Sequence, residues 1–322
     1  MAKLVALEDI KNEKYKYLWN PYMPYGAVSV FQGQGGYGKT SLVCKIMAEA
    51  SWGIYPPRLH KGGMMACEEL SPWQEYCLQK MLTEPERERF SFLASEYHNG
   101  FLLEGIDYEE EEEEAVDVPN LDVPRFRTIG EPIKMTYVSR ENHYGNIIRM
   151  KYQAYGGRPG FVRIVDESDG RFVTSEDLIL EMIADSKLLV IDPIYAFVEG
   201  RLEDNSDVAE AIEHLESAAR KTGACILLLN NLSKTSSASD YNSGLGASNL
   251  KNLVRSLFKI DMSGKLRYIE GIKINISEFK GKIGLLRDEL GRYDYINYEQ
   301  AEEYLLEGMS MPDDMTATQK IA

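Results

Sequence analysis

Short apolar runs alternate with amphipathic stretches along most of this chain, and glycine, proline or polar segments separate them. Runs rich in β-branched and aromatic residues are typical of strands, whereas apolar residues spaced three or four apart are typical of helices. Five such runs predict strands, at residues 27–32, 134–139, 161–165, 187–192 and 224–230. Strands that alternate with helices in this way indicate an α/β fold with a mainly parallel central sheet.

The best-defined helix is predicted between the last two of these strands. Val208, Ile212, Leu215 and Ala219 share one helical face, and Gly223 follows where a left-handed residue would end the helix. Strand, helix and strand together predict a βαβ unit. Four further strands, at residues 256–261, 268–275, 282–287 and 293–297, are separated by turns and predict a C-terminal β-meander.

We expect one domain over residues 1–322, interrupted by an insertion at 53–132. Ser71 with Gln74, and Thr83 with Glu86, have capping-box spacing and predict a helical pair there. The glutamate run 109–114 repels itself, which favours a disordered loop, with an acidic partner-binding loop as the alternative. Residues 312–322 begin a capped helix and stop, so they are either the start of a truncated C-terminal module or a frayed tail.

The net charge of −15 argues against a protein that coats DNA by bulk electrostatics, because phosphate neutralisation needs clustered basic residues. Residues 234–292 nevertheless hold eleven Lys/Arg against six Asp/Glu. This segment is where nucleic acid would bind, or else it is an ordinary solvated face. No apolar run is long enough to span a bilayer, and the first twenty residues lack an apolar signal core, so we expect no membrane partner and a cytoplasmic location.

The four cysteines suggest no special chemistry. They are scattered without CxxC spacing or paired histidines, which argues against a zinc site and a disulfide framework. Buried, inert thiols are the simplest interpretation.

A glycine-rich motif follows the first predicted strand and opens a helical run. Its eight residues match GxxxxGK[ST], and with the next residue they form the predicted cofactor-binding segment: Gly33, Gln34, Gly35, Gly36, Tyr37, Gly38, Lys39, Thr40 and Ser41. Glycines let backbone N–H groups wrap phosphates, and the helix N-terminus adds partial positive charge. We therefore predict an ATP site in which Lys39 reaches the β- and γ-phosphates and Thr40 ligates Mg²⁺.

A second nucleotide signature ends at Asp192. The preceding run, Lys187 to Ile191, is apolar after its first residue and predicts a buried parallel strand that delivers a carboxylate at its end. Next to the phosphate loop, such a carboxylate holds Mg²⁺ through water together with Thr40. The predicted metal site is therefore Thr40 and Asp192.

Taken in order, these motifs resemble RecA-superfamily P-loop ATPases related to the hexameric plasmid helicase RepA, a family of phages and mobile elements. The resemblance covers most of the chain outside the insertion. Besides the glycine-rich motif, it rests on residues 18–21, 138–155, 190–193, 196–197, 228–234, 244–247, 255–257, 273–275 and 280–282.

The resemblance implies a glutamate that orients the attacking water, at the end of the strand after the P-loop helix. Glu141 follows the better strand, and Glu68 or Glu69 is the alternative inside the insertion. It also implies a phosphate-sensing pair at Asn230 and Asn231, where the family often has two histidines. Asparagine can hydrogen-bond phosphate or water but does not titrate near neutral pH.

The resemblance further implies a ring oligomer, such as a hexamer, in which a late strand supplies a Lys-x-Arg pair to the neighbouring subunit's ATP. The aligned residues here are Lys273 and Asn275, so the second cation is missing, and Arg255 is a further candidate. The functions that follow are a DNA-dependent ATPase motor or helicase acting on single-stranded DNA, or a regulatory nucleotide-binding module with slow turnover. A metabolic small-molecule kinase fits the P-loop but not the order of the later motifs.

Overall fold

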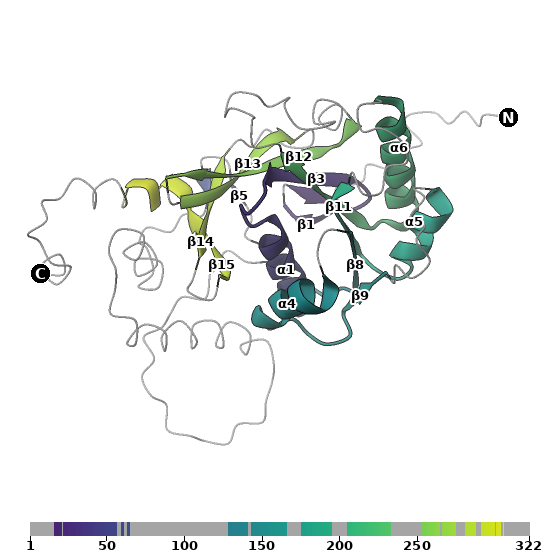
Figure 1. Ribbon diagram of the computed structural model, residues 1–322, viewed down its shortest axis with the longest axis horizontal. Helices are drawn as coiled ribbons and strands as arrows, with labels where there is room; N and C mark the ends of the chain where they lie inside the picture. Colours follow the sequence, from purple (N-terminus) through teal and green to yellow (C-terminus); the bar gives the residue numbers. More distant parts are fainter. Residues whose placement is uncertain are drawn as a thin grey trace, which may run out of the picture.

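A nine-stranded sheet forms the centre of the computed structural model (Figure 1). The structure describes residues 16–20, 22–56, 59–60, 63–64, 128–140, 143–165, 175–194, 205–232, 253–264, 266–274, 281–287, 291–299, 301–303 and 305. The strands of the sheet are β3 (Val28–Gln34), β8 (Met135–Ser139), β9 (Val162–Ile164), β10 (Leu188–Asp192), β11 (Cys225–Leu232), β12 (Ser256–Ser263), β13 (Leu266–Ile274), β14 (Lys282–Arg287) and β15 (Tyr293–Asn297).

The order of the strands across the sheet is β15-β14-β13-β12-β3-β11-β10-β8-β9. From β12 to β9 all neighbours are parallel, whereas β12 to β15 form an antiparallel meander. Strand β3 lies in the middle and is buried over its first six residues. All nine predicted strands belong to this sheet, and the predicted α/β fold with a parallel core and a C-terminal meander is confirmed.

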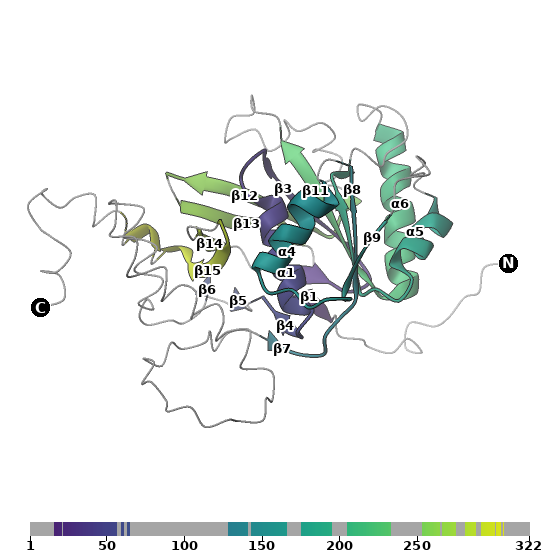
Figure 2. The ribbon, with the colours of Figure 1, turned by 60° about the horizontal axis from the view of Figure 1, so that its bottom comes forward.

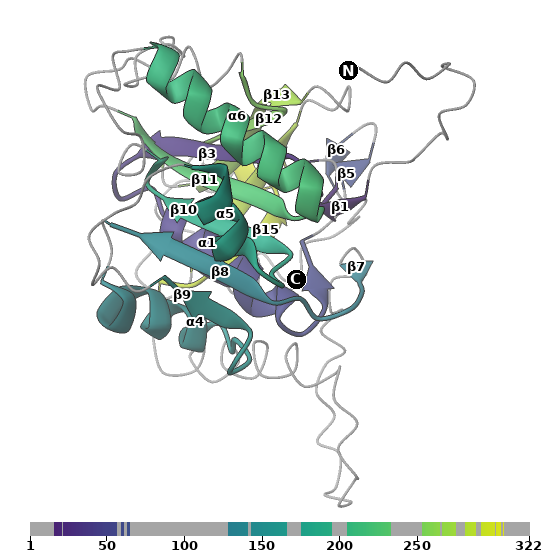
Figure 3. The ribbon, with the colours of Figure 1, turned by 90° about the vertical axis from the view of Figure 1, so that its right-hand side faces the viewer.

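Helices cover both faces of the parallel part of the sheet (Figures 2 and 3). Helix α1 (Lys39–Ala50) and the short α4 (Met150–Ala154), which continues the π-helical turn η2 (Tyr144–Arg149), lie on one face. Helices α5 (Glu176–Ile183) and α6 (Asn205–Thr222) lie on the other. Each face has its own hydrophobic cluster, because successive strand residues point to opposite sides.

The predicted βαβ unit is confirmed, and α6 is its helix. Val208, Ile212, Leu215 and Ala219 are all buried against the sheet, and Gly223 has the positive φ of 69° that its position after the helix demands. Helix α5 was not predicted. A two-stranded sheet of β1 (Tyr17–Trp19) and β2 (Met23–Pro24), also not predicted, precedes β3.

Short antiparallel pairs lie at the ends of the expected insertion, outside the central sheet. Strand β4 (Ile54–Tyr55) pairs with β7 (Thr128–Ile129), and the Gly130 amide donates to the Gly53 carbonyl at 2.8 Å. Strand β5 (Leu59–His60) pairs with β6 (Gly63–Met64). The two capping boxes, the glutamate run 109–114 and residues 312–322 lie outside the described residues, so the domain boundaries stay predictions.

None of the helices that the structure describes combines the length and the apolar character needed to cross a membrane.

Candidate functional site

The glycine-rich loop lies where the central strand β3 ends and α1 begins. Gly36 and Gly38 have φ of 83° and 94°, and Gly38 is the residue that caps α1, so two positions of the loop need conformations that side chains disfavour. A Cβ on Gly33 would lie 2.6 Å from the Ile260 carbonyl oxygen of β12. The loop therefore curls tightly over the C-terminal end of β3, and a glycine-rich turn before a helix N-terminus is suited to cradle phosphate.

Lys39 is the first residue of α1, and its ammonium group folds back over the loop. The side chain is buried, and Nζ donates to the carbonyl oxygens of Gly33 at 2.8 Å and Gln34 at 3.0 Å. These bonds hold the charge inside the ring of loop atoms that would surround phosphates. The predicted phosphate-binding lysine is thus placed by the backbone that also forms the cradle.

Asp192 ends strand β10 on the same face of the sheet as α1. Its side chain is 3% exposed, and Oδ2 accepts hydrogen bonds from the Tyr137 hydroxyl at 2.5 Å and from Thr40 Oγ1 at 3.4 Å. Burial and the neighbouring Asp192 charge hold the pKa of Tyr137 well above its ordinary value, so its hydroxyl stays a donor. The structure therefore brings the two predicted metal ligands together and adds Tyr137, which sequence reasoning missed.

These groups fit Mg²⁺ bound together with a nucleotide, rather than a cage made of protein alone. The described residues contain no group of three or more His, Cys, Asp or Glu side chains that could hold a metal ion. One carboxylate and one hydroxyl suit a cation that keeps several waters and takes its other ligands from phosphate oxygens. The donor set thus agrees with the cradle beside it.

Strand β8 is the neighbour of β10 in the sheet, and Ser139 pairs with Asp192. The Arg140 amide then donates to the Asp192 carbonyl oxygen at 3.1 Å. Glu141 is the next residue in sequence, although it lies outside the described residues, as do Glu68 and Glu69. Since Met64 belongs to a two-stranded sheet with β5, the strand position supports Glu141, whose role stays a prediction.

Asn230 and Asn231 point to opposite faces of strand β11, because side chains alternate along a strand. Asn230 is 2% exposed and lies two positions after Leu228, so it shares the strand face of Leu228, which packs in the cluster under α5 and α6. Asn231 is paired with Gly33 and follows Leu229, which packs in the cluster under α1. Of the predicted pair, only Asn231 is thus on the side of the phosphate loop.

Lys273 and Arg255 lie away from the phosphate loop of their own chain. Lys273 pairs with Leu257 of β12, and Leu257 pairs in turn with Val30 of β3. Arg255 comes just before β12. Gly33 is three residues farther along β3, or about 10 Å at the rise of a strand. The structure therefore does not bring these two cations together with Lys39 and Asp192 within one subunit.

Tyr293, at the start of β15, reaches the phosphate loop from the meander. A Cβ on Gly38 would collide with its ring and hydroxyl, its amide donates to the Tyr155 hydroxyl at 2.7 Å, and the guanidinium of Arg267 lies 5.9 Å from its ring centroid. Burial raises the pKa of Tyr293, with the charges of Arg267 and Arg287 acting in the opposite direction. Sequence reasoning missed this residue, since only the folded meander brings it to Gly38.

Two comparisons with known proteins found a match. Residues 118–237 match the model of an AAA domain, a range that includes Asp192, Asn230 and Asn231 but not the glycine-rich loop. Among solved structures, the chain is similar to a KaiC-like protein from the hyperthermophilic archaeon Pyrococcus horikoshii OT3, with 14% identity, a TM-score of 0.46, and coverage of 85% of this chain and 91% of that chain. No curated protein matches the chain.

The order of the parallel strands decides the fold. Strand β3 carries the phosphate loop, β11 separates it from β10, and β10 carries the acidic residue that faces Thr40. The chain has the fold of a RecA-like P-loop NTPase. A nucleotide therefore belongs at the C-terminal ends of these strands, where the phosphate loop, Thr40 and Asp192 meet.

Proposed function

We propose that this protein hydrolyses ATP with Mg²⁺ and works as a DNA-associated motor, a helicase among them, in a ring of identical subunits. The observation that carries the ATPase proposal is the contact of Thr40 with Asp192 across 152 residues of sequence, beside a phosphate cradle that holds Lys39. Two independent sequence motifs thus meet at one point. A glycine-rich turn without function would not need the second motif.

Each side chain of the site has a task in this proposal. Lys39 moves from the loop carbonyls to the β- and γ-phosphates, and Thr40 and Asp192 position the metal, the latter through water. When bound, Mg²⁺ supplies charge neutralisation at the phosphate oxygens. Glu141 orients the attacking water, and Asn231 hydrogen-bonds the γ-phosphate side from β11. Most of the rate enhancement then comes from positioning and electrostatics.

The motor proposal rests on the resemblance to RepA-like helicases and on the topology of the sheet. Parallel strands β10 and β11 both end at the edge of the sheet that carries the phosphate loop, and we propose that ATP hydrolysis at this edge is coupled to a bound DNA strand. A regulatory module with slow turnover is the second candidate. Asn275, in the place of a second cation, favours it, because an arginine supplied in trans accelerates hydrolysis by about 10³- to 10⁵-fold in other NTPases.

One experiment separates these functions. ATPase rates are measured with and without single-stranded DNA, and the mass of the particle is determined by light scattering under the same conditions. We expect an oligomer whose rate rises at least tenfold with DNA. Lys39→Ala, which removes the cation at the β- and γ-phosphates, serves as the control and should lose ATP binding and turnover.

The other outcomes are equally informative. A monomer that binds ATP tightly and is not stimulated by DNA would support the regulatory module. Wild-type affinity and turnover in Lys39→Ala would show that residues 33–40 are only a turn, and would remove the ATPase proposal altogether.

A further inference from the structure

A second lysine lies beside the phosphate loop, brought there by an element that belongs to neither the glycine-rich motif nor the strand that ends at Asp192. Lys151 belongs to α4, and its Nζ donates to Ser41 Oγ at 2.6 Å. Ser41 is buried in the first turn of α1 and directly follows Thr40. The two residues are 110 positions apart in sequence. Figure 2 shows α4 lying alongside α1, which is how the contact arises.

The position of Lys151 is fixed by bonds on both sides of it. Ile148, one turn earlier, is buried, and its carbonyl faces the Cys44 thiol of α1 at 4.0 Å. After α4, the indole of Trp52 donates to the Gly156 carbonyl at 2.8 Å, and the Arg158 amide donates to Ser51 Oγ at 2.9 Å. Helix α4 is thus held against α1 and the turn after α1 by contacts on both sides of Lys151.

The ammonium group lies in a place where positive charge already accumulates. The N-terminus of a helix carries a partial positive charge, and Lys39 is in the same turn of α1. In the described part of the chain, Lys151 forms no ion pair with a carboxylate, and its partner is the neutral Ser41 hydroxyl. A cation held at this end of a helix interacts unfavourably with the dipole until an anion joins it. The arrangement is therefore suited to bind an anion.

The Cys44 thiol lies one turn after Thr40 and interacts with the charges of both Lys151 and Asp192. Burial raises its pKa to about 12; the Lys151 charge works against this shift and the Asp192 charge adds to it. Lys151 and Asp192 therefore flank the first turns of α1. Lys39 and the metal ligands serve the β- and γ-phosphates, and Ser41 lies one residue deeper in the helix. Lys151 is therefore placed to contact the α-phosphate, which is the phosphate next to the nucleoside.

We propose that Lys151 is a second phosphate-binding cation, which turns from Ser41 to the α-phosphate, or to the α–β bridge, of a bound nucleoside diphosphate or triphosphate. This inference rests on the proposed nucleotide site and adds a residue to it. Because ADP and ATP share these phosphates, Lys151 strengthens the binding of both by similar factors. It acts in ground-state binding and contributes little to the step at the γ-phosphate.

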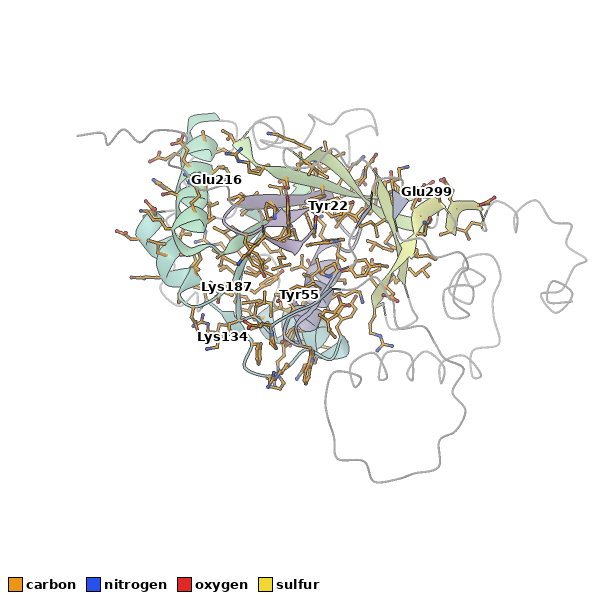
Figure 4. The ribbon with its side chains drawn as sticks, turned by 180° about the vertical axis from the view of Figure 1, so that it is seen from behind. Tyr22, Tyr55, Lys134, Lys187, Glu216 and Glu299 are labelled. Carbon is orange, nitrogen blue, oxygen red and sulfur yellow. The ribbon has the colours of Figure 1, made fainter. Side chains whose placement is uncertain are left out.

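The test compares the affinities of ADP and ATP, measured by calorimetric titration with Mg²⁺, in wild type and Lys151→Met. Methionine keeps most of the apolar stem and removes the charge. We expect both affinities to fall about 5- to 30-fold, with turnover at saturating ATP within about threefold of wild type. Lys151→Arg should recover most of the affinity. The matched control is Lys187→Met. Lys187 lies near Lys134 at the N-terminal ends of the parallel strands, whereas the phosphate loop lies at their C-terminal ends (Figure 4).

Each other outcome overturns the inference. Unchanged affinities in a folded Lys151→Met protein would show that the bond to Ser41 is only structural. Loss of ATP affinity with ADP affinity intact would move the contact to the γ-phosphate. Loss of affinity in the arginine variant, together with a lowered melting temperature, would assign the lysine to packing. If wild type itself binds neither nucleotide, the proposed function fails first, and Lys39→Ala will then show no effect either.

Discussion

At the scale of single residues, Asp192 shows how much of the site depends on the direction of one buried carboxylate. A carboxylate at 3% exposure needs hydrogen-bond donors, and Tyr137 and Thr40 supply them. The Thr40 bond is the longer of the two, at 3.4 Å. The Tyr137 bond is short and buried, and it fixes the direction of the carboxylate.

Removing the Tyr137 hydroxyl should therefore weaken the affinity of the site for Mg²⁺ more than it weakens the stability of the fold. We expect Tyr137→Phe to raise the Mg²⁺ concentration for half-maximal ATPase activity about tenfold, the lower end of the range for groups that orient metal ligands. The measurement is a Mg²⁺ titration at fixed ATP. Tyr55→Phe, which removes the part-buried bond to the Glu131 carbonyl at 2.5 Å, is the control and should leave the titration unchanged. An unshifted curve for Tyr137→Phe would end this role.

Residues with local chemistry were predictable from the sequence, and residues placed by packing were not. Gly33 to Thr40 form a contiguous motif, and Asp192 ends an apolar run, so each has a signal within a few positions. Tyr137 is one aromatic residue within a predicted strand, and Lys151 is distant in sequence from both motifs, so neither has a local signal. Strand alternation could have separated Asn230 from Asn231, because the faces of β11 follow from its apolar positions.

At the scale of elements, the strand order gives β8 its importance. Parallel pairing of β8 with β10 brings the C-terminal ends of both strands to the same edge, and the Arg140 amide continues this pairing beyond β8. Glu141 is the next residue in sequence after Arg140. Strands β5 and β6, which precede Glu68 and Glu69 in sequence, form a separate two-stranded sheet and offer no comparable strand position.

We therefore expect Glu141→Gln to keep ATP affinity and to lower turnover by two or more orders of magnitude. Loss of charge at a group that orients the attacking water affects the transition state more than the ground state. Single-turnover kinetics and calorimetric titration together measure both quantities. Glu68→Gln and Glu69→Gln are the matched controls and should be close to wild type. A dead Glu68→Gln protein would mean that the water is oriented from the insertion instead.

Helix α6 contains an acidic residue whose burial makes stability depend on pH. Glu216 is 8% exposed, and its Oε1 accepts from the Val28 amide at 3.4 Å (Figure 4). Burial raises the pKa of Glu216 above its ordinary 4.5, although the Val28 amide and the charges of Arg255 and Arg220 oppose this shift. The folded protein thus binds a proton that the unfolded chain has lost, and stability declines as pH rises through this window.

Replacing Glu216 with Gln should remove this dependence. We expect similar free energies of unfolding for wild type and Glu216→Gln at pH 4, and a growing advantage for the variant as pH rises to 7, measured by urea denaturation. Glu213→Gln, at an exposed position of the same helix, is the control. A variant that loses stability relative to wild type with rising pH would show that the ionised carboxylate is favourable, through Arg220 and Arg255.

Sequence patterns did not predict the elements that are short or that pair with residues distant in sequence. Helix α5 has eight residues and a clear start, since Ser175 Oγ accepts from the Leu178 amide at 3.4 Å and two acidic residues follow. Ala184, the residue that follows the helix, has a φ of 43° without being glycine, so the usual stop signal is missing. The two-residue strands β4 and β7 carry no periodic pattern and pair across 73 positions of sequence.

At the scale of the whole molecule, the phosphate site and the two late cations lie at different levels of the sheet. Lys39 and Asp192 are at the C-terminal edge of the parallel strands, whereas Arg255 precedes β12 and Lys273 is level with its first residues. About 10 Å of strand separates these levels, which is too far for direct contact within a subunit. If either cation serves ATP, it serves the ATP of a neighbour.

The last prediction tests this action between subunits. Arginine binds phosphate through a planar fork and lysine as a point charge, so Lys273 beside Asn275 should give a smaller gain than a complete Lys-x-Arg pair. Lys39→Ala and Lys273→Ala proteins are each expected to be nearly inactive, and mixing them should restore ATPase activity, because some interfaces then combine an intact Lys39 with an intact Lys273.

The mixtures are assayed over a range of ratios, with light scattering to show that the two variants assemble together. The same mixture with Arg255→Ala in place of Lys273→Ala shows which cation acts. Co-assembled mixtures that stay inactive at every ratio would exclude Lys273 as a residue acting in trans, and would leave a ring whose subunits hydrolyse ATP slowly with their own side chains alone.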